Sequence, residues 1–326
     1  MKLEEIMKLA VQMGIEKDPR GKAEIKRLLQ RNREKYEKLT DKEKQYFDMD
    51  SLDNPFPDSR ILVGDPKTEV RSALVGVDME APEVLLADRL REKGEAVDLI
   101  ISHHPEGQGL INLDKVMALQ ADEWYRHGVP INVGEALIGK RMQEIYRAFL
   151  PRNVERALDV ARLLDIPFMS MHTVADNQVY SYLNDYLGRK KPRTVGEVID
   201  LLLEIPEYQA AARIQAGPVA IVGGNENRAG KIMVDMTGGT EGPQEVLEKL
   251  ADAGVGTIVA MHYSEKHKDE AEKQKINVII AGHIVSDSLG MNLILDRLEE
   301  KGLRITPVSG LVRVSRARKK TARGKS

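Results

Sequence analysis

Five of the seven histidines in this 326-residue sequence follow short apolar runs that are typical of buried strands. These five are His103, His104, His172, His262 and His283. Two of them have a carboxylate four residues further on, in the segments HTVAD (His172, Asp176) and HIVSD (His283, Asp287). At the start of a helix, four residues make about one turn, so the two groups lie on one face and can share a metal ion. The pattern predicts a metal site built from imidazole and carboxylate groups.

The number of candidate ligands favours two ions over one. Five or six ligands exceed the four that a tetrahedral site needs. Paired ions bridged by a carboxylate and water are used to hydrolyse phosphate or amide-like bonds, and a water whose pKa they lower would be the nucleophile. The sequence has no cysteine, so the ligands are nitrogen and oxygen atoms, which suit Zn, Fe, Mn or Ni about equally.

From about residue 61, predicted strands alternate with predicted helices, and these elements must position the histidines. Residues 72–106 and 231–265 repeat one pattern, in which Val77-Asp78-Met79 corresponds to Val234-Asp235-Met236 and His103 corresponds to His262. We therefore expect an α/β fold of two related lobes, with mixed sheets flanked by helices and the site in the cleft between the lobes. Residues 61–314 would form this core.

The segments outside the repeat carry less chemistry. Residues 1–60 are predicted to be extra N-terminal helices and a linker, SLDNPFPDSR, with no part in the site. VPINV is predicted to be a short strand, and IPFMSMHTVADN a strand that runs into a polar loop. The glycine-bearing loops VGGNENRAG and TGGTEGP fit neither a P-loop nor a dinucleotide fingerprint, and we interpret them as turns. Residues 315–326 form a basic tail, predicted to be disordered or to bind RNA weakly and without sequence specificity.

The composition narrows the class of protein. The formal net charge of −2 gives no overall attraction to nucleic acid or to anionic membranes. No apolar run approaches the roughly 20 residues that span a bilayer, and the N-terminus shows no signal-peptide pattern. We expect a cytoplasmic protein that acts on a small molecule.

Three segments, DLIISHHP, HTVAD and INVIIAGHIVSD, resemble in their order the signature segments of the Nif-three-like family, some members of which are named GTP cyclohydrolase one type two homologue. The resemblance covers residues 61–310 and implies a two-lobed α/β protein that assembles as a toroidal homohexamer with a dinuclear metal site. The ligands that it implies are His103, His104, Asp176, His283 and Asp287. His103 and His104 would each bind a different ion, with Asp176 or Asp287 bridging. The family usually has Glu where this chain has Asp287, which is shorter by one methylene.

Three further residues are candidates for catalysis. His172 is not a ligand in the family pattern, so it is a proton donor, a group that orients a ligand, or a structural histidine bonded to the backbone. His262 and Glu265 follow the strand that the repeat pairs with the one before His103. They would contact substrate or act as general acid and base, or else be structural.

Four functions fit these residues. The favoured one is a metal-dependent hydrolase acting on a small phosphorylated or nucleotide-like substrate. GTP ring opening is implied by the family resemblance alone, because no residue here indicates guanine recognition. A DHH-type phosphoesterase fits less well, because that family has Asp before its two histidines and this chain has Ser102. The fourth function is a non-catalytic one, as a metal-binding scaffold or a partner-binding protein.

Overall fold

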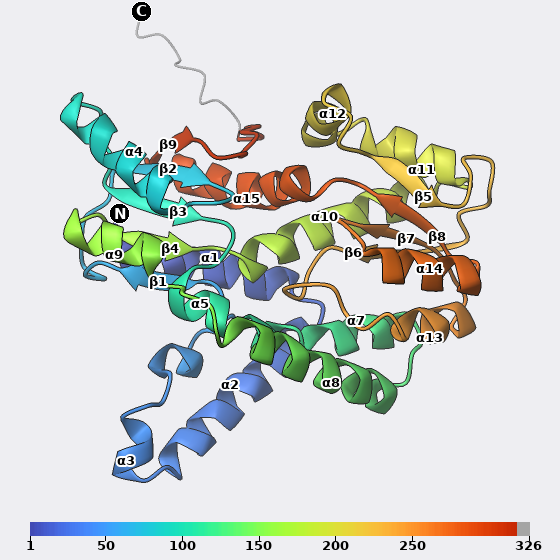
Figure 1. Ribbon diagram of the computed structural model, residues 1–326, viewed down its shortest axis with the longest axis horizontal. Coiled ribbons are helices and arrows are strands. Elements are labelled where there is room, and N and C mark those ends of the chain that lie inside the picture. Colours follow the sequence, from blue (N-terminus) through green and yellow to red (C-terminus); the bar gives the residue numbers. More distant parts are fainter. Residues whose placement is uncertain (318–326) are drawn as a thin grey trace, which may run out of the picture.

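Two α/β lobes lie side by side in the computed structural model, which describes residues 1–317 (Figure 1). The strands are β1 (Arg60–Val63), β2 (Ser72–Gly76), β3 (Leu99–Ser102), β4 (Phe168–Ser170), β5 (Val219–Val222), β6 (Lys231–Asp235), β7 (Val255–Ala260), β8 (Asn277–Ile280) and β9 (Arg304–Pro307). The helices are α1 (Leu3–Lys17), α2 (Gly21–Glu37), α3 (Asp41–Lys44), the 3-10 turn η1 (Met49–Leu52), α4 (Ala81–Glu92), α5 (Gly107–Ile111), α6 (Leu113–Val116), α7 (Leu119–Arg126), α8 (Ile131–Phe149), α9 (Arg156–Leu163), α10 (Thr173–Lys190), α11 (Val195–Leu202), α12 (Pro206–Arg213), α13 (Val246–Asp252), α14 (Glu265–Gln274) and α15 (His283–Glu300).

The two sheets share the order and direction of four strands, and β9 adds a fifth strand to the first sheet. The first has the order β1-β4-β3-β2-β9 and the second β5-β8-β7-β6. In each sheet the first strand is antiparallel to its neighbour, and the remaining pairs are parallel. The repeated segments 72–106 and 231–265 supply β2 and β3 in one sheet and β6 and β7 in the matching places of the other. The expected α/β fold, with mixed sheets flanked by helices, is confirmed.

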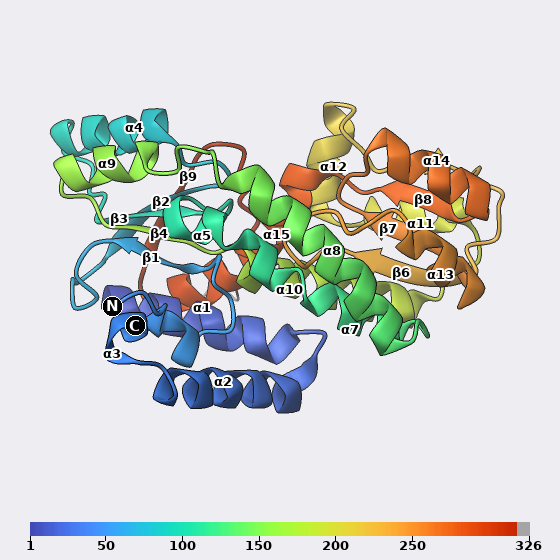
Figure 2. The same ribbon diagram turned by 60° about the horizontal axis from the view of Figure 1, so that its bottom comes forward.

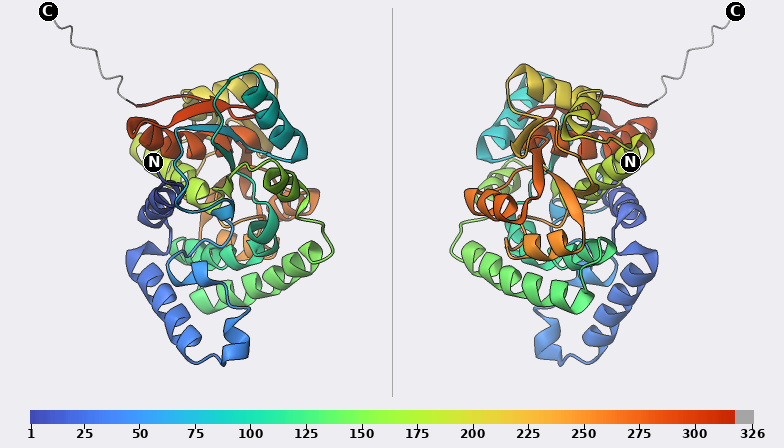
Figure 3. Two further views of the ribbon diagram at one scale, coloured as in Figure 1. Left: turned by 90° about the vertical axis from the view of Figure 1, so that its left-hand side faces the viewer. Right: turned by 90° about the vertical axis from the view of Figure 1, so that its right-hand side faces the viewer.

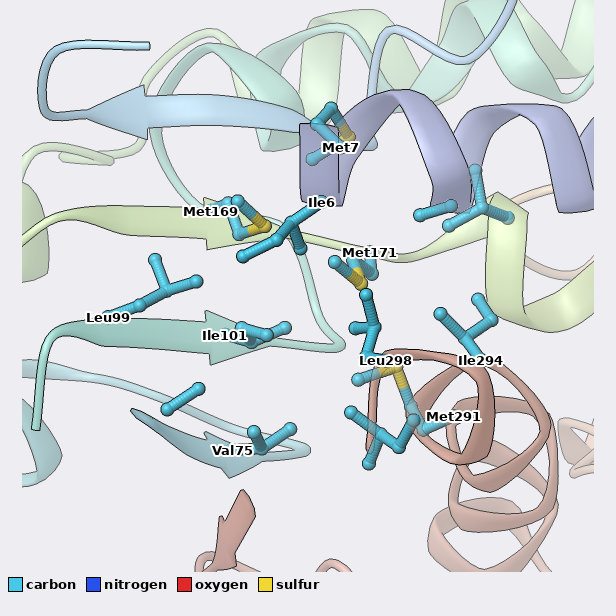
Figure 4. Close-up of a cluster of buried hydrophobic side chains, with 14 of the residues drawn as sticks. Ile6, Met7, Val75, Leu99, Ile101, Met169, Met171, Met291, Ile294 and Leu298 are labelled. Atoms are coloured by element: carbon cyan, nitrogen blue, oxygen red, sulfur yellow. The ribbon is translucent and has the colours of Figure 1, made fainter. Parts of the chain in front are cut away.

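Helix α1 is part of the core of the first lobe. Ile6 and Met7 of α1 belong to one buried cluster with Met171, after β4, and Met291 of α15 (Figure 4). Burial of one such side chain contributes roughly 1.5–3 kcal/mol. By contrast, α2 buries only Ile25 among its own residues and extends from the body together with α3 (Figure 3). The N-terminal segment is thus part core helix and part projecting hairpin.

The helices between β3 and β4 join the lobes. Trp124 of α7 and Ile138 of α8 lie in a buried cluster with Met233 of β6 and Leu247 of α13. Figure 2 shows α7 and α8 running across the junction towards the second lobe. This packing places α7 behind the loop that follows β6, which matters for the site below.

Two predictions of local structure are wrong. VPINV is the start of α8, because Pro130 occupies the N-cap, where its missing N–H costs nothing, and Gly134, Ile138 and Ile145 then face the core at helical spacing. HTVADN is the start of α10 and not a polar loop. Its polar residues face the interior, so the usual contrast between a polar and an apolar helix face is absent from the sequence.

The C-terminal boundary lies further along than residue 314. Both terminal nitrogens of Arg316 bond to the carboxylate of Glu207 at 2.6 Å. The rest of the predicted disordered tail, residues 318–326, lies outside the described residues. Within residues 1–317 no helix combines the length and the apolar composition needed to cross a membrane.

Candidate metal centre

Parallel strands and two packed helices bring the predicted ligands to one place. His103 and His104 follow β3, and His172 lies between β4 and α10 in the same sheet. His283 begins α15 directly after β8 of the other sheet. The side-by-side packing of α10 and α15 brings their first turns together, and with them Asp176 and Asp287. All five predicted ligands lie within one cluster.

Asp287 is the centre of this cluster. Its Oδ1 lies 3.4 Å from Nε2 of His103, which is also 3.5 Å from Oδ1 of Asp176. Its Oδ2 lies 3.6 Å from Nε2 of His104 and 3.6 Å from Nε2 of His283. The two oxygens thus face two different sets of nitrogens, so the shorter aspartate reaches both.

The donor atoms fit a metal. Four of them are buried and have no hydrogen-bond partner within the described residues: Nε2 of His103, Oδ1 of Asp176 and both carboxylate oxygens of Asp287. Burying such groups without a partner costs several kcal/mol, because their hydration is lost. Three overlapping groups have donor atoms within 4.8 Å of one another: His103–His104–His172, His104–His283–Asp287 and His103–Asp176–Asp287. The cluster therefore can hold a metal ion.

Hydrogen bonds at Nδ1 orient three of the histidines. His104 donates to Oδ1 of Asp78 at 2.6 Å, and His103 to the carbonyl of Met171 at 3.2 Å. His172 donates to Oδ2 of Asp58 at 2.8 Å. At His103 and His104 such partners fix the ring and leave Nε2 to face an ion, as is common for metal-binding histidines. Asp58 is buried and lies in the predicted linker, so the expectation that residues 1–60 have no part in the site is wrong.

Burial and neighbouring charges shift the pKa values of these groups in different directions. Burial opposes a charged Asp287, but its histidine neighbours, His103 foremost, outweigh burial and lower its pKa to about 2. Burial raises the pKa of Asp176 to about 6 and lowers the pKa of His283 to about 4. Burial also opposes a charged His172, yet Asp176 and Asp58 raise its pKa to about 9. Ionised Asp287 and neutral His283 are the forms that bind metal.

The second lobe forms the opposite wall of a pocket over this cluster. His172, Asp176, His283 and Asp287 line one side. The other side includes Glu241 and His262, whose Nδ1 lies 3.0 Å from Oε1 of Glu241. The hydrogen bond that His262 donates to Glu241 raises the pKa of His262. Its ring centroid lies 4.7 Å from that of His283.

Glu265 does not join the site. It begins α14, its side chain is 77% exposed, and it pairs with Lys268 at 2.9 Å. Glu241, Asp58 and Asp78 are near the cluster instead, and the sequence analysis missed all three. Asp78 was the one with a signal, since it lies in the repeated segment Val77-Asp78-Met79. Glu241 lies in the glycine loop interpreted as a turn, and Asp58 is remote from every histidine in sequence.

Solved structures of other proteins have folds similar to that of this chain. A NIF3 superfamily protein from Sphaerobacter thermophilus matches with a TM-score of 0.68 and 28% identity, over 78% of this chain and 92% of that one. Reduced HcgD from Methanocaldococcus jannaschii matches with a TM-score of 0.50 and 15% identity, over 82% of this chain and 94% of that one, and shows likeness of fold alone. No protein-family model and no curated protein matches the sequence.

Proposed function

We propose that this chain, whose fold is NIF3-like, is a hydrolase that uses two divalent metal ions and acts on a small phosphorylated or nucleotide-like substrate. The observation that carries the proposal is the position of Asp287, with one oxygen towards His103 and the other towards His104 and His283. A carboxylate in this position would be a ligand to both ions and hold them together. His103 and Asp176 would hold one ion, and His104 and His283 the other.

The metal pair would supply Lewis acidity and a water of lowered pKa. The chain's own residues then have separate tasks. Asp78, Asp58 and the Met171 carbonyl hold three imidazoles in position through Nδ1. His262 is the proposed proton donor and acceptor, because Glu241 binds its Nδ1 and leaves Nε2 free to exchange a proton with substrate. His172 is a second proton-holding group at the pocket, and Glu241 takes the place that the sequence analysis gave to Glu265.

Hydrolysis is tested by screening the metal-loaded protein for phosphate release from phosphoesters and nucleotides. We expect Asp287→Asn to lower the rate for any active substrate by about 100-fold or more, since the isosteric amide cannot bridge two cations. Asp296→Asn is the matched control, because Asp296 is a buried aspartate on the same helix that binds Arg313 instead. Equal rates for Asp287→Asn and wild type would place the activity elsewhere. Bound metal without turnover of any substrate would favour the metal-binding scaffold.

We also propose a homo-oligomer, a hexamer by family resemblance. Leu85 and Leu86 of α4 and Leu163 of the neighbouring α9 are exposed apolar side chains that support contact between subunits. Light scattering on the purified protein tests this, with the mass of six chains as the expected result and the mass of one chain as the contradicting one.

A further inference from the structure

The loop between β6 and α13 forms part of the pocket wall opposite the metal cluster. Its residues 237–242, TGGTEG, contribute Thr237, Gly239, Thr240 and Glu241 to the lining. Gln120 of α7 lies behind the loop, is buried and does not line the pocket. Its Nε2 donates to the carbonyls of both Gly238 and Thr240 at 2.7 Å. One amide group from the first lobe therefore holds two peptide units of the second.

These bonds determine where the next N–H groups point. The only cis peptide bond in residues 1–317 is Gly217–Pro218, so both peptide units of the loop are trans. In a trans peptide the C=O and the N–H point in opposite directions. Because the two carbonyls point to Gln120, the N–H groups of Gly239 and Glu241 point away from Gln120, and both residues line the pocket. Neither N–H has a hydrogen-bond partner within residues 1–317.

The loop is built for close contact with Gln120. A Cβ on Gly238 would lie 2.5 Å from Cγ of Gln120, and a Cβ on Gly242 2.6 Å from its Oε1. Gly238 and Gly239 have φ values of +96° and +84°, which other residues rarely adopt. From behind, Arg141 also donates to the carbonyl of Glu241 at 3.2 Å. The backbone is thus fixed before any ligand arrives.

The rest of the pocket shows what this loop can bind. Among the described residues that line it there is no lysine or arginine, while there are four carboxylates, those of Asp176, Asp235, Glu241 and Asp287. Oδ1 of Asp176 and both oxygens of Asp287 are buried and unpartnered, which marks the same space as a ligand site. An anionic group would find no lysine or arginine here, and the only described lining side chains able to carry a positive charge are the imidazoles of His172, His262 and His283. Preorganised backbone N–H groups are the standard alternative for holding an anionic oxygen.

We propose that the N–H groups of Gly239 and Glu241 bind an anionic oxygen of the substrate, with Gln120 as the positioning residue. This inference rests on the proposed function, since the anion would lie between the loop and the ions. Phosphoryl and carboxylate groups share the required chemistry. The loop, which the sequence analysis interpreted as a turn, would therefore select substrates by charge.

The experiment uses the full chain loaded with Zn²⁺ and inorganic phosphate as the probe. In protein labelled with ¹⁵N-glycine, we expect the amide proton of Gly239 to move downfield as phosphate binds. Gln120→Met should keep the metal content of wild type. It should weaken phosphate binding about tenfold, because the loop loses the hydrogen bonds that hold the carbonyls of Gly238 and Thr240. Gln209→Met is the control, because Gln209 also donates from Nε2 to one backbone carbonyl, that of Leu203 at 2.9 Å, but on α12.

Two results would overturn the inference. One is phosphate binding that leaves the Gly239 amide unmoved. The other is an equal phosphate affinity in Gln120→Met and Gln209→Met. The Gly239 signal decides the matter in wild-type protein even if Gln120→Met fails to fold. Failure of the proposed function is visible separately, as absence of stoichiometric Zn²⁺ from the wild type.

Discussion

Asp58 and His172 are 114 residues apart in the sequence, and Nδ1 of His172 donates to Oδ2 of Asp58 at 2.8 Å inside the protein. The same oxygen accepts a hydrogen bond from the hydroxyl of Thr173 at 2.6 Å. The segment before β1 is thereby joined to the first turn of α10, which carries Asp176. The position of a proposed metal ligand thus depends on a residue far from it in sequence.

Replacement of Asp58 tests this link. We expect Asp58→Asn to lower the free energy of unfolding of the metal-free protein by about 3 kcal/mol, because it removes the carboxylate that is hydrogen-bonded to a buried imidazolium and leaves only Asp176 near it. Urea unfolding measures the change. Asp53→Asn, which removes an exposed carboxylate paired with Arg33, should cost less than about 0.5 kcal/mol. Equal stability of the two variants would show that the Asp58–His172 pair does not stabilise the fold.

Gly290 controls the approach of the two helices that carry Asp176 and Asp287. A Cβ at Gly290 would lie 2.3 Å from the carbonyl oxygen of Ala175, so Gly290→Ala must separate α15 from α10. We expect it to destabilise the protein by about 2 kcal/mol and to reduce bound metal. Gly188→Ala on α10 meets no atom within 4 Å and should be neutral or stabilising by up to about 1 kcal/mol. Thermal unfolding and metal content check both, and unchanged metal in Gly290→Ala would contradict this account.

The C-terminal residues contribute to stability. Arg316→Gln leaves the fully buried carboxylate of Glu207 with only the Asn292 amide as a described side-chain partner. We expect a loss of about 3 kcal/mol in urea unfolding. Arg297→Gln, which breaks an exposed pair with Glu300, should change stability by less than about 0.5 kcal/mol. A neutral Arg316→Gln would mean that residues 315–317 add nothing to the core.

The lowered pKa of His127 predicts that the free energy of unfolding depends on pH independently of the metal site. Burial, with Lys231 and Arg126 nearby, lowers its pKa to about 4 from an ordinary value of 6.5. The unfolded chain therefore binds a proton at a higher pH than the folded chain does. Stability is fully present above pH 6.5 and falls as the pH drops through about 4, by up to about 3 kcal/mol.

The check is the free energy of unfolding of wild type and His127→Gln at pH 7 and pH 4.5. The variant should lose less stability on acidification than wild type, because it has no imidazole to protonate. Identical losses would show that other groups cause the acid sensitivity.

The sequence allowed the cluster to be predicted but not its surroundings. Histidines that end parallel strands of one sheet converge, so His103 and His172 could be found from local pattern. His283 and Asp287 come from the other sheet, and the internal repeat predicted that the strand ends of the two lobes would face one cleft. Glu265 was chosen because it is near His262 in sequence, but it starts α14 and turns outwards. Glu241 lines the pocket, and Gln120 supports its loop from behind, only because α7 packs against the loop after β6, and no local spacing in the sequence records that packing.

The most direct test of the central claim is the metal content per chain, measured by elemental analysis of carefully purified wild type and of the double variant His103→Ala with Asp176→Ala. The account predicts close to two ions per chain in the wild type and their loss in the variant. Wild-type protein without stoichiometric metal, or a variant that retains it, would contradict the account.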